Sequence, residues 1–143
     1  MTPNTIFNTL KKLFSSYEAF CSPLCKDMNV NQTAFDIIMF LANNPEYNTA
    51  KDITNKRGIK PNLVSFTVEK LVQDGFITRN EVPGDRRKIG LVCTDKAREI
   101  IAQGHDIQSR FITSLLKDID KEDLDVLEHC ISKIKNNMEN IQV

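Results

Sequence analysis

Hydrophobic residues recur at helical spacing near both ends of this chain. From Ile6 to Phe20 they stand three or four positions apart, which predicts one face of a long amphipathic helix. Pro23 is expected to kink or end that helix. Near the other end, Asp120 with Asp123 predicts a helix start. The apolar positions that follow form a heptad seam, which requires a partner helix: Leu124, Leu127, Ile131, Ile134, Met138 and Ile141.

Between these ends the pattern predicts a tightly connected pair of helices. Residues 35–42 are apolar on most sides, as expected for a helix at the centre of a fold, opened by Asn31 or Gln32. Thr49 and Asp52 form a capping-box pattern for a short helix that ends at Gly58. Pro61 suits the first turn of a second helix, which runs to about residue 74 before Gly75. Two helices joined by a tight glycine-containing turn indicate a helix-turn-helix.

A cation-rich hairpin follows the second helix. Residues 77–82 and 88–93 are short β-rich runs, and Pro83-Gly84-Asp85 between them favours a turn. Arg86, Arg87 and Lys88 crowd the return side of the hairpin. Since two strands alone are barely stable in water and a core has no use for adjacent cations, the tip is expected to contact a polyanion. Thr94 is expected to cap the next helix.

These elements predict a mainly α fold with a small β-hairpin wing (α+β), a winged helix-turn-helix. Residues 1–30 are expected to form an N-terminal dimerisation helix, residues 31–93 the DNA-binding region and residues 94–143 the C-terminal dimerisation helices. The terminal helices carry more apolar surface than the small region between them could cover, so we expect a homodimer.

Charge is unevenly distributed along the 143 residues, although the net charge is zero. Residues 51–90 hold nine Lys and Arg against five Asp and Glu, a net charge of +4. Local charge governs phosphate contact, so a neutral total is compatible with binding double-stranded DNA. No apolar run approaches the roughly 20 residues of a membrane span, and the first residues lack the order of a signal peptide. We therefore expect a cytoplasmic protein with no membrane contact.

Candidate chemistry is sparse. The four cysteines and two histidines lack the spacing of a zinc cluster, so no metal or cofactor is expected. His105 stands without the further histidines that a metal site would use. The chain has no Ser/His/Asp set and no phosphate-binding loop, which argues against an enzyme. Cys21 and Cys25 are candidate redox thiols, but their apolar neighbours favour a packing role.

Two segments resemble the MarR family of bacterial winged-helix regulators. GDRRKIGLVCTDKARE (residues 84–99) is similar to the wing signature of that family, and IKPNLVSFTVEKLVQDGFITR (residues 59–79) is similar to its recognition helix. The resemblance implies a dimeric transcriptional regulator, more often a repressor, released from DNA by a small ligand or by cysteine oxidation. The operator is expected to be an imperfect palindrome of about 15 to 20 base pairs.

The resemblance also implies roles for particular positions. Arg87 would enter the minor groove with Asp85 bracing it, while Arg86 and Lys88 would contact phosphates. Phe66 stands where relatives often carry Arg, so phosphate contacts and the wing are expected to carry more of the affinity. The candidate DNA-binding residues of the recognition helix are Lys60, Pro61, Asn62, Leu63, Ser65, Phe66 and Lys70; among them Asn62 suits adenine, and Leu63 or Phe66 suits thymine methyl groups.

A candidate effector pocket follows from fold analogy alone. It would lie between the dimerising helices and the DNA-binding region, lined by Phe14, Tyr17, Phe35 and Met39, and would take a small aromatic ligand. The alternative hypothesis is a winged-helix module that has lost DNA binding and acts by binding protein.

Overall fold

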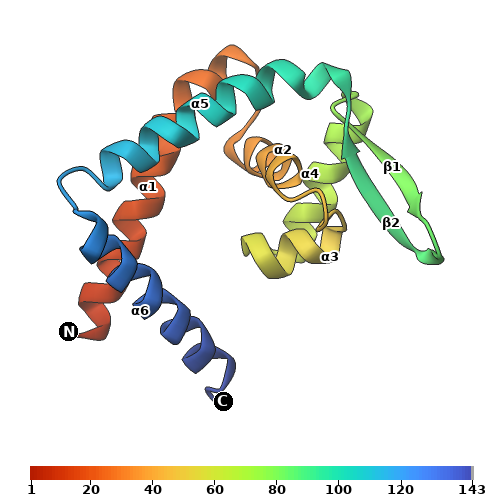
Figure 1. Cartoon of the computed structure of the whole chain (residues 1–143). Coiled ribbons are helices and arrows are strands. Elements are labelled where there is room, and N and C mark those ends of the chain that lie inside the picture. The colour runs from red at the N-terminus through yellow and green to blue at the C-terminus, as the bar shows by residue number, and fades with distance from the viewer. Residues whose placement is uncertain (143) are drawn as a thin grey trace. The chain divides into compact units, whose positions relative to one another are not determined.

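The computed structural model describes residues 1–142 and divides into two compact units, Met1–Phe111 and the segment from Ile112 onward. The order of the elements follows the predicted one (Figure 1). They are α1 (Pro3–Asp27), α2 (Gln32–Asn43), α3 (Ala50–Asp52), a π-helical turn η1 (Ile53–Arg57), α4 (Pro61–Gln73), β1 (Ile77–Val82), β2 (Asp85–Cys93), a 3-10 turn η2 (Asp95–Ala97), α5 (Arg98–Leu115) and α6 (Lys121–Glu139). None of the described helices is long and apolar enough to cross a membrane.

Local capping determines where several helices begin. The side chain of Asn31 accepts a hydrogen bond from the backbone N–H of Ala34 and so caps α2. Thr49 and Asp52 form both hydrogen bonds of the capping box at α3. These bonds satisfy backbone donors that have no partner inside the helix. The predicted starts of both helices are confirmed.

Pro23 does not end α1, which corrects one of the two outcomes expected for it. The helix continues for another turn to Asp27. Proline removes one backbone hydrogen bond from a helix interior. Three side chains around it, Cys21, Leu24 and Cys25, are buried, and their packing offsets that loss.

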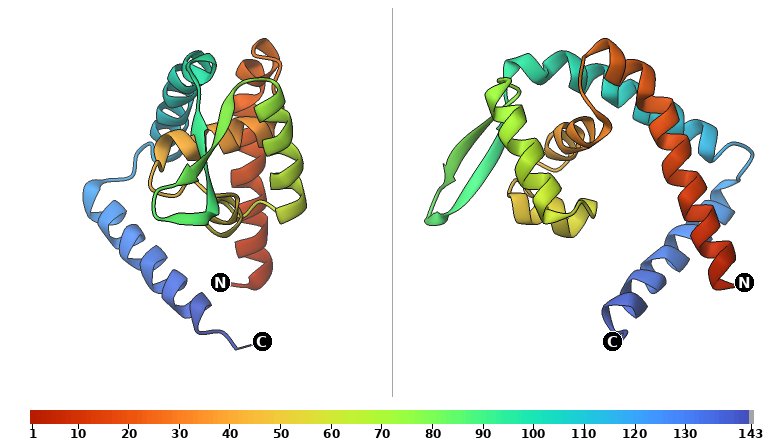
Figure 2. Two further views of the ribbon diagram at one scale, coloured as in Figure 1. Left: turned by 90° about the vertical axis from the view of Figure 1, so that its right-hand side faces the viewer. Right: turned by 180° about the vertical axis from the view of Figure 1, so that it is seen from behind.

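The core of the first unit is built around α2, which lies between α1 and α4 (Figure 2). Phe35, Ile37, Ile38 and Met39 are at most 1% exposed, so the helix predicted to be central is confirmed. The backbone of α5 approaches this core at Gly104. A Cβ atom there would collide with Sδ of Met39 and lie 3.1 Å from the ring of Phe35.

The hairpin is antiparallel, and β2 begins earlier than predicted. Ile77 pairs with Cys93, and Val82 pairs with Asp85 after an irregularity at Glu81 and Val82. Asp85 is therefore a strand residue, and the turn itself is Pro83-Gly84. Gly84 has a φ of 83°, a left-handed conformation that glycine adopts without steric cost.

Thr94 has a different role from the predicted helix cap. Its hydroxyl donates to the carbonyl of Gly75 (2.6 Å) and forms no capping bond, and the turn η2 precedes α5. The ammonium group of Lys96 also donates to the carbonyl of Asp74. These bonds occur because the end of α4 and the start of α5 meet at the base of the hairpin, a contact between segments about twenty residues apart.

The second unit contains α6, which begins at the predicted cap. Asp120 accepts from the backbone N–H of Asp123 (2.9 Å). No residue of α6 is buried, and five seam positions have exposures from 42% for Leu127 to 65% for Ile141. The helix and its apolar stripe are confirmed, whereas a partner for the stripe remains a prediction.

Candidate nucleic-acid interface

A left-handed glycine makes the turn between α3 and α4. Gly58 has a φ of 76° and ends η1, with its N–H donating to the carbonyl of Thr54. A Cβ atom at Gly58 would meet nothing within 4 Å, so the constraint is conformational rather than steric. Pro61 then occupies the first turn of α4. The helix-turn-helix is thus built from the residues that predicted it.

The two faces of α4 differ sharply in exposure. Val64, Val68 and Leu71 are buried against the core, as the spacing predicted. On the opposite face Leu63 is 42% and Phe66 is 69% exposed. The other predicted contact residues of this helix, Pro61, Asn62, Ser65 and Lys70, and its preceding residue Lys60 are also exposed. The helix therefore presents a mixed polar and apolar surface.

The wing presents its cations without protein partners. Within the described chain no carboxylate lies within 4.0 Å of the charged groups of Arg86, Arg87 or Lys88, and all three residues are exposed. Asp85 accepts from the backbone N–H of Arg87 (2.9 Å). It therefore holds the backbone of the tip and leaves the guanidinium of Arg87 free to contact an anion.

An ion pair connects the wing to the recognition helix. The guanidinium of Arg79 on β1 lies 2.6 Å from the carboxylate of Glu69 on α4. The hydrogen bond and charge of Arg79 hold the pKa of Glu69 below its usual range. The pair neutralises the one acidic side chain on the outer face of α4, which would otherwise repel phosphate.

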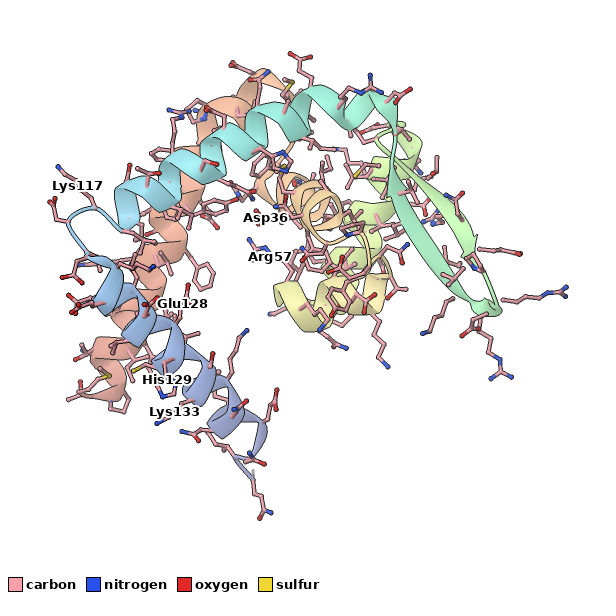
Figure 3. All side chains as sticks on the ribbon, in the orientation of Figure 1. Asp36, Arg57, Lys117, Glu128, His129 and Lys133 are labelled. Atoms are coloured by element: carbon pink, nitrogen blue, oxygen red, sulfur yellow. The ribbon has the colours of Figure 1, made fainter. Side chains whose placement is uncertain are left out.

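A second ion pair connects α2 to the turn η1 (Figure 3). The guanidinium of Arg57 lies 3.1 Å from the carboxylate of Asp36, which also accepts from the side-chain amide of Gln32. Burial raises the pKa of Asp36, and the nearby Arg57 opposes that shift. Sequence reasoning missed this pair, because nothing in the chain signals a contact across 21 positions.

The four residues of the predicted effector pocket occupy three different environments. Phe35 and Met39 are part of the closed core, and Phe14 is exposed. Tyr17 is half-buried: its ring packs edge-on against Phe111, and its hydroxyl accepts from Gln108 (2.9 Å). Burial raises the pKa of Tyr17 to about 12.

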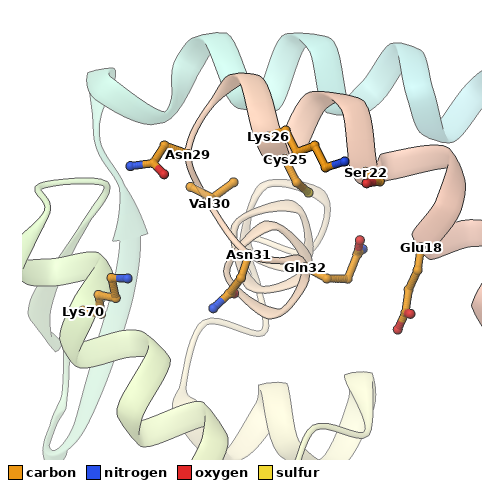
Figure 4. A pocket seen from close by; sticks show the side chains of 9 residues that line it. All are labelled: Glu18, Ser22, Cys25, Lys26, Asn29, Val30, Asn31, Gln32 and Lys70. Atoms are coloured by element: carbon orange, nitrogen blue, oxygen red, sulfur yellow. The ribbon is translucent and has the colours of Figure 1, made fainter.

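A cleft of about 620 Å³ lies nearby, around the connection between α1 and α2 (Figure 4). Sequence reasoning missed it, because its polar lining comes from a helix end, a loop and a distant helix. Lys26 and Lys70 contribute positive charge, and Cys25 is the one lining residue that the sequence had singled out. The full lining is Glu18, Ser22, Cys25, Lys26, Asn29, Val30, Asn31, Gln32 and Lys70.

The candidate redox thiols are shielded from solvent. Cys21 and Cys25 are buried. Burial raises the pKa of both thiols, that of Cys25 to about 11. Reactive thiols require the opposite shift and access to solvent, so this environment is that of packing residues.

The histidine considered as a metal ligand belongs to a polar network. The Nε2 atom of His105 lies 2.8 Å from Oδ1 of Asn43, whose amide donates to Gln108. Gln108 in turn donates to Tyr17. Within residues 1–142 no three His, Cys, Asp or Glu side chains are grouped as metal ligands would be.

A helix-turn-helix with an exposed recognition helix, followed by a hairpin with unpaired cations, defines the winged-helix class of DNA-binding proteins. Residues 27–88 match the model of the MarR family. The match covers the helix-turn-helix and most of the wing, and the chain has the MarR-like winged helix-turn-helix fold of transcriptional regulators.

Similar proteins share this fold or part of this sequence. The chain is 24% identical to YdgJ of Bacillus subtilis, described as an uncharacterized HTH-type transcriptional regulator, over 79% of this chain and 68% of that protein. The structure of a MarR protein from Peptoclostridium difficile covers 98% of this chain and 91% of its own, at 18% identity and a TM-score of 0.80. A MarR-family regulator from Listeria monocytogenes, solved with a 26mer DNA, covers 94% and 89% at 12% identity and a TM-score of 0.78.

Proposed function

We propose that this protein represses transcription as a homodimer bound to an imperfect palindromic operator. The observation that carries the proposal is the exposed outer face of α4, followed by a wing whose three cations have no carboxylate partner in the described chain. A recognition helix enters the major groove, and a cationic wing tip suits the negative potential of the adjacent minor groove. Arg87 would enter that groove, with Arg86 and Lys88 on phosphates.

The unpaired apolar surface of the terminal helices supports a dimer. Large apolar side chains are exposed in the single chain on both terminal helices: Phe7 and Phe14 of α1, and the seam of α6. In soluble proteins an apolar surface of this size is normally covered by a partner. A twofold dimer places two recognition helices one turn of DNA apart, which gives an operator of about 15 to 20 base pairs. Repression follows when that operator overlaps a promoter, because the bound dimer then blocks it. The protein would act in the cytoplasm.

We further propose that a small anionic aromatic molecule, rather than thiol oxidation, releases the protein from DNA. The cleft beside α1 and α2 supports this, because Lys26 and Lys70 supply positive charge at its wall. Lys70 also lies on the recognition helix, so a ligand that engages it would compete with phosphate contact. The buried state of Cys21 and Cys25 favours this route over oxidation.

Gel-shift titration against the DNA upstream of the protein's own gene tests the proposal. Arg87→Ala should weaken binding to all sequences, and it should reduce the slope of log K against log salt by about one, because one cationic contact with the DNA is lost. Asn62→Ala should lose about 1 to 3 kcal/mol on the cognate site only. Arg98→Ala, which removes an exposed cation paired with Asp95 at the start of α5, is the control and should bind normally.

The alternative, a winged-helix module that binds only protein, predicts a different result. No shifted complex would form, or the complex would survive unchanged in the double variant Arg87→Ala with Asn62→Ala. The effector proposal has a separate test, a thermal-shift screen of aromatic acids. Stabilisation of the wild type that is lost in Lys26→Gln supports the cleft, and equal stabilisation of both contradicts it.

A further inference from the structure

The outer face of α4 lacks the side chains that read guanine. Between Lys60 and Lys70 the helix contains no Lys or Arg, and the acidic Glu69 is engaged by Arg79. Guanine is read in the major groove chiefly by Arg or Lys, which donate two hydrogen bonds to its O6 and N7 atoms. Direct recognition by the first two turns of α4 must therefore use other contacts.

Two large apolar side chains occupy this face instead. Leu63 and Phe66 are three positions apart, which places them side by side on a helix surface. They are 42% and 69% exposed, while the residues that alternate with them, Val64 and Thr67, are buried. Burial of exposed apolar side chains against a partner surface is favourable, because it removes them from water.

The major groove offers one apolar group to such side chains. The other base edges present hydrogen-bond donors and acceptors, and cytosine a small C5–H, whereas thymine presents its C5-methyl group. We propose that Leu63 and Phe66 read thymine C5-methyl groups in each half-site, so that affinity depends on methyls at those positions. The inference rests on the proposed binding of operator DNA and specifies how that operator is read.

The same contact predicts that methylation of cytosine affects binding. 5-Methylcytosine carries its methyl group at the position where thymine carries it. A cytosine at a contacted position should therefore bind poorly when unmodified and better when methylated. A side chain that reads hydrogen bonds would not respond in this way.

Binding-site selection from a random duplex pool provides the probe. Wild-type protein selects a consensus duplex, which is then synthesised with deoxyuridine in place of thymidine at one position per half-site at a time. Deleting one methyl contact should weaken binding about fourfold, and a symmetric pair of deletions should weaken it about 10- to 20-fold. Substituting 5-methylcytosine for cytosine at the same positions should recover a similar factor.

Variants assign the effect to the two side chains. Leu63→Ala and Phe66→Ala should each lose the discrimination at the position that the truncated side chain contacts, and the double variant should bind thymidine and deoxyuridine duplexes equally well. Phe66→Leu should retain part of the discrimination. Val92→Ala removes a comparably exposed apolar side chain from β2 and should keep the full discrimination, which separates methyl contact from a change in DNA shape. Circular dichroism and thermal melts confirm that each variant is folded.

The outcomes separate this inference from the function on which it rests. A selection that returns no consensus would refute sequence-specific DNA binding itself. A consensus that binds equally with thymidine and deoxyuridine at every position would overturn the methyl contact and leave the regulator function intact. Discrimination that persists at every position in the double variant Leu63→Ala with Phe66→Ala would also overturn it.

Discussion

The helices α2 and α6 are both strongly patterned in the sequence, yet their apolar side chains have opposite environments. Four large side chains of α2 are almost completely buried within the first unit. In α6, which carries its apolar residues along one stripe, no residue is buried. A helix that is apolar on most sides must be surrounded by its own chain, whereas a single stripe needs only one partner. The sequence pattern therefore indicates how much of a helix surface must be buried, and the tertiary structure determines which segments bury it.

The largest effect should come from placing a charge in the α6 seam. We expect Ile131→Asp to convert the dimer into monomers and to weaken operator binding at least about 100-fold, since an unpaired charge would have to be buried in the interface. Sedimentation equilibrium and gel shift measure the two effects. Ser132→Asp, which adds the same charge beside the seam, is the control. A variant Ile131→Asp that remains dimeric would refute the seam as the interface.

The core should respond differently to a change at Gly104. In Gly104→Ala the added Cβ meets Met39 and Phe35; overpacking costs about 1 to 3 kcal/mol, and the better helix propensity of alanine returns up to about 1 kcal/mol. Urea denaturation should show a net loss of unfolding free energy that is the same at all protein concentrations. Gln103→Ala on the exposed side of α5 is the control. A gain in stability of about 1 kcal/mol, the propensity effect alone, would mean that α5 does not approach α2 as closely as described.

The smallest effect should be a dependence of stability on alkaline pH that originates at Tyr17. Burial raises the pKa of its phenol from 10.0 to about 12, so between these values the unfolded chain loses the proton first. The contribution of Tyr17 is complete below pH 10 and is lost as the pH rises toward about 12. We expect at most about 1 to 2 kcal/mol, because the side chain is only partly buried.

Urea denaturation of wild type and Tyr17→Phe at pH 9, 10 and 11 measures this term. Burial also raises the pKa of Cys25 in both proteins. The difference between them therefore reports the phenol together with the thiol of Cys21, which interacts with it. The wild type should lose stability faster than Tyr17→Phe over this range. Parallel curves would place Tyr17 in contact with solvent.

Features that depend on neighbours in the chain were predicted well. The capping box of Thr49 and Asp52, the glycine stop after α4 and the cap of α6 at Asp120 join residues three or four positions apart. Their geometry follows from helix chemistry with little help from the rest of the molecule. The wing was also predicted, although β2 begins at Asp85 rather than Lys88, because strand pairing extends further than β propensity indicates.

The exposed face of α4 was predicted from the sequence, whereas the cleft beside α1 and α2 was not. The periodicity of α4 separated the inward Val64 and Val68 from the outward Leu63 and Phe66. The cleft beside Lys26 and its approach to Lys70 had no sequence signal. It depends on where a loop and two helices meet, which no local pattern encodes.

The amino-acid sequence by itself determined the helices, their caps, the wing and the face of α4 that is exposed, because these depend on side-chain period and on hydrogen bonds within one turn. Only the tertiary structure decided that Asp36 pairs with Arg57, that the hydroxyl of Thr94 holds Gly75, and that Phe35 is enclosed while Phe14 is exposed. Those outcomes depend on which distant segments pack together. Burial, ion pairing and pKa are set by the atoms that surround a group, whatever their distance along the chain.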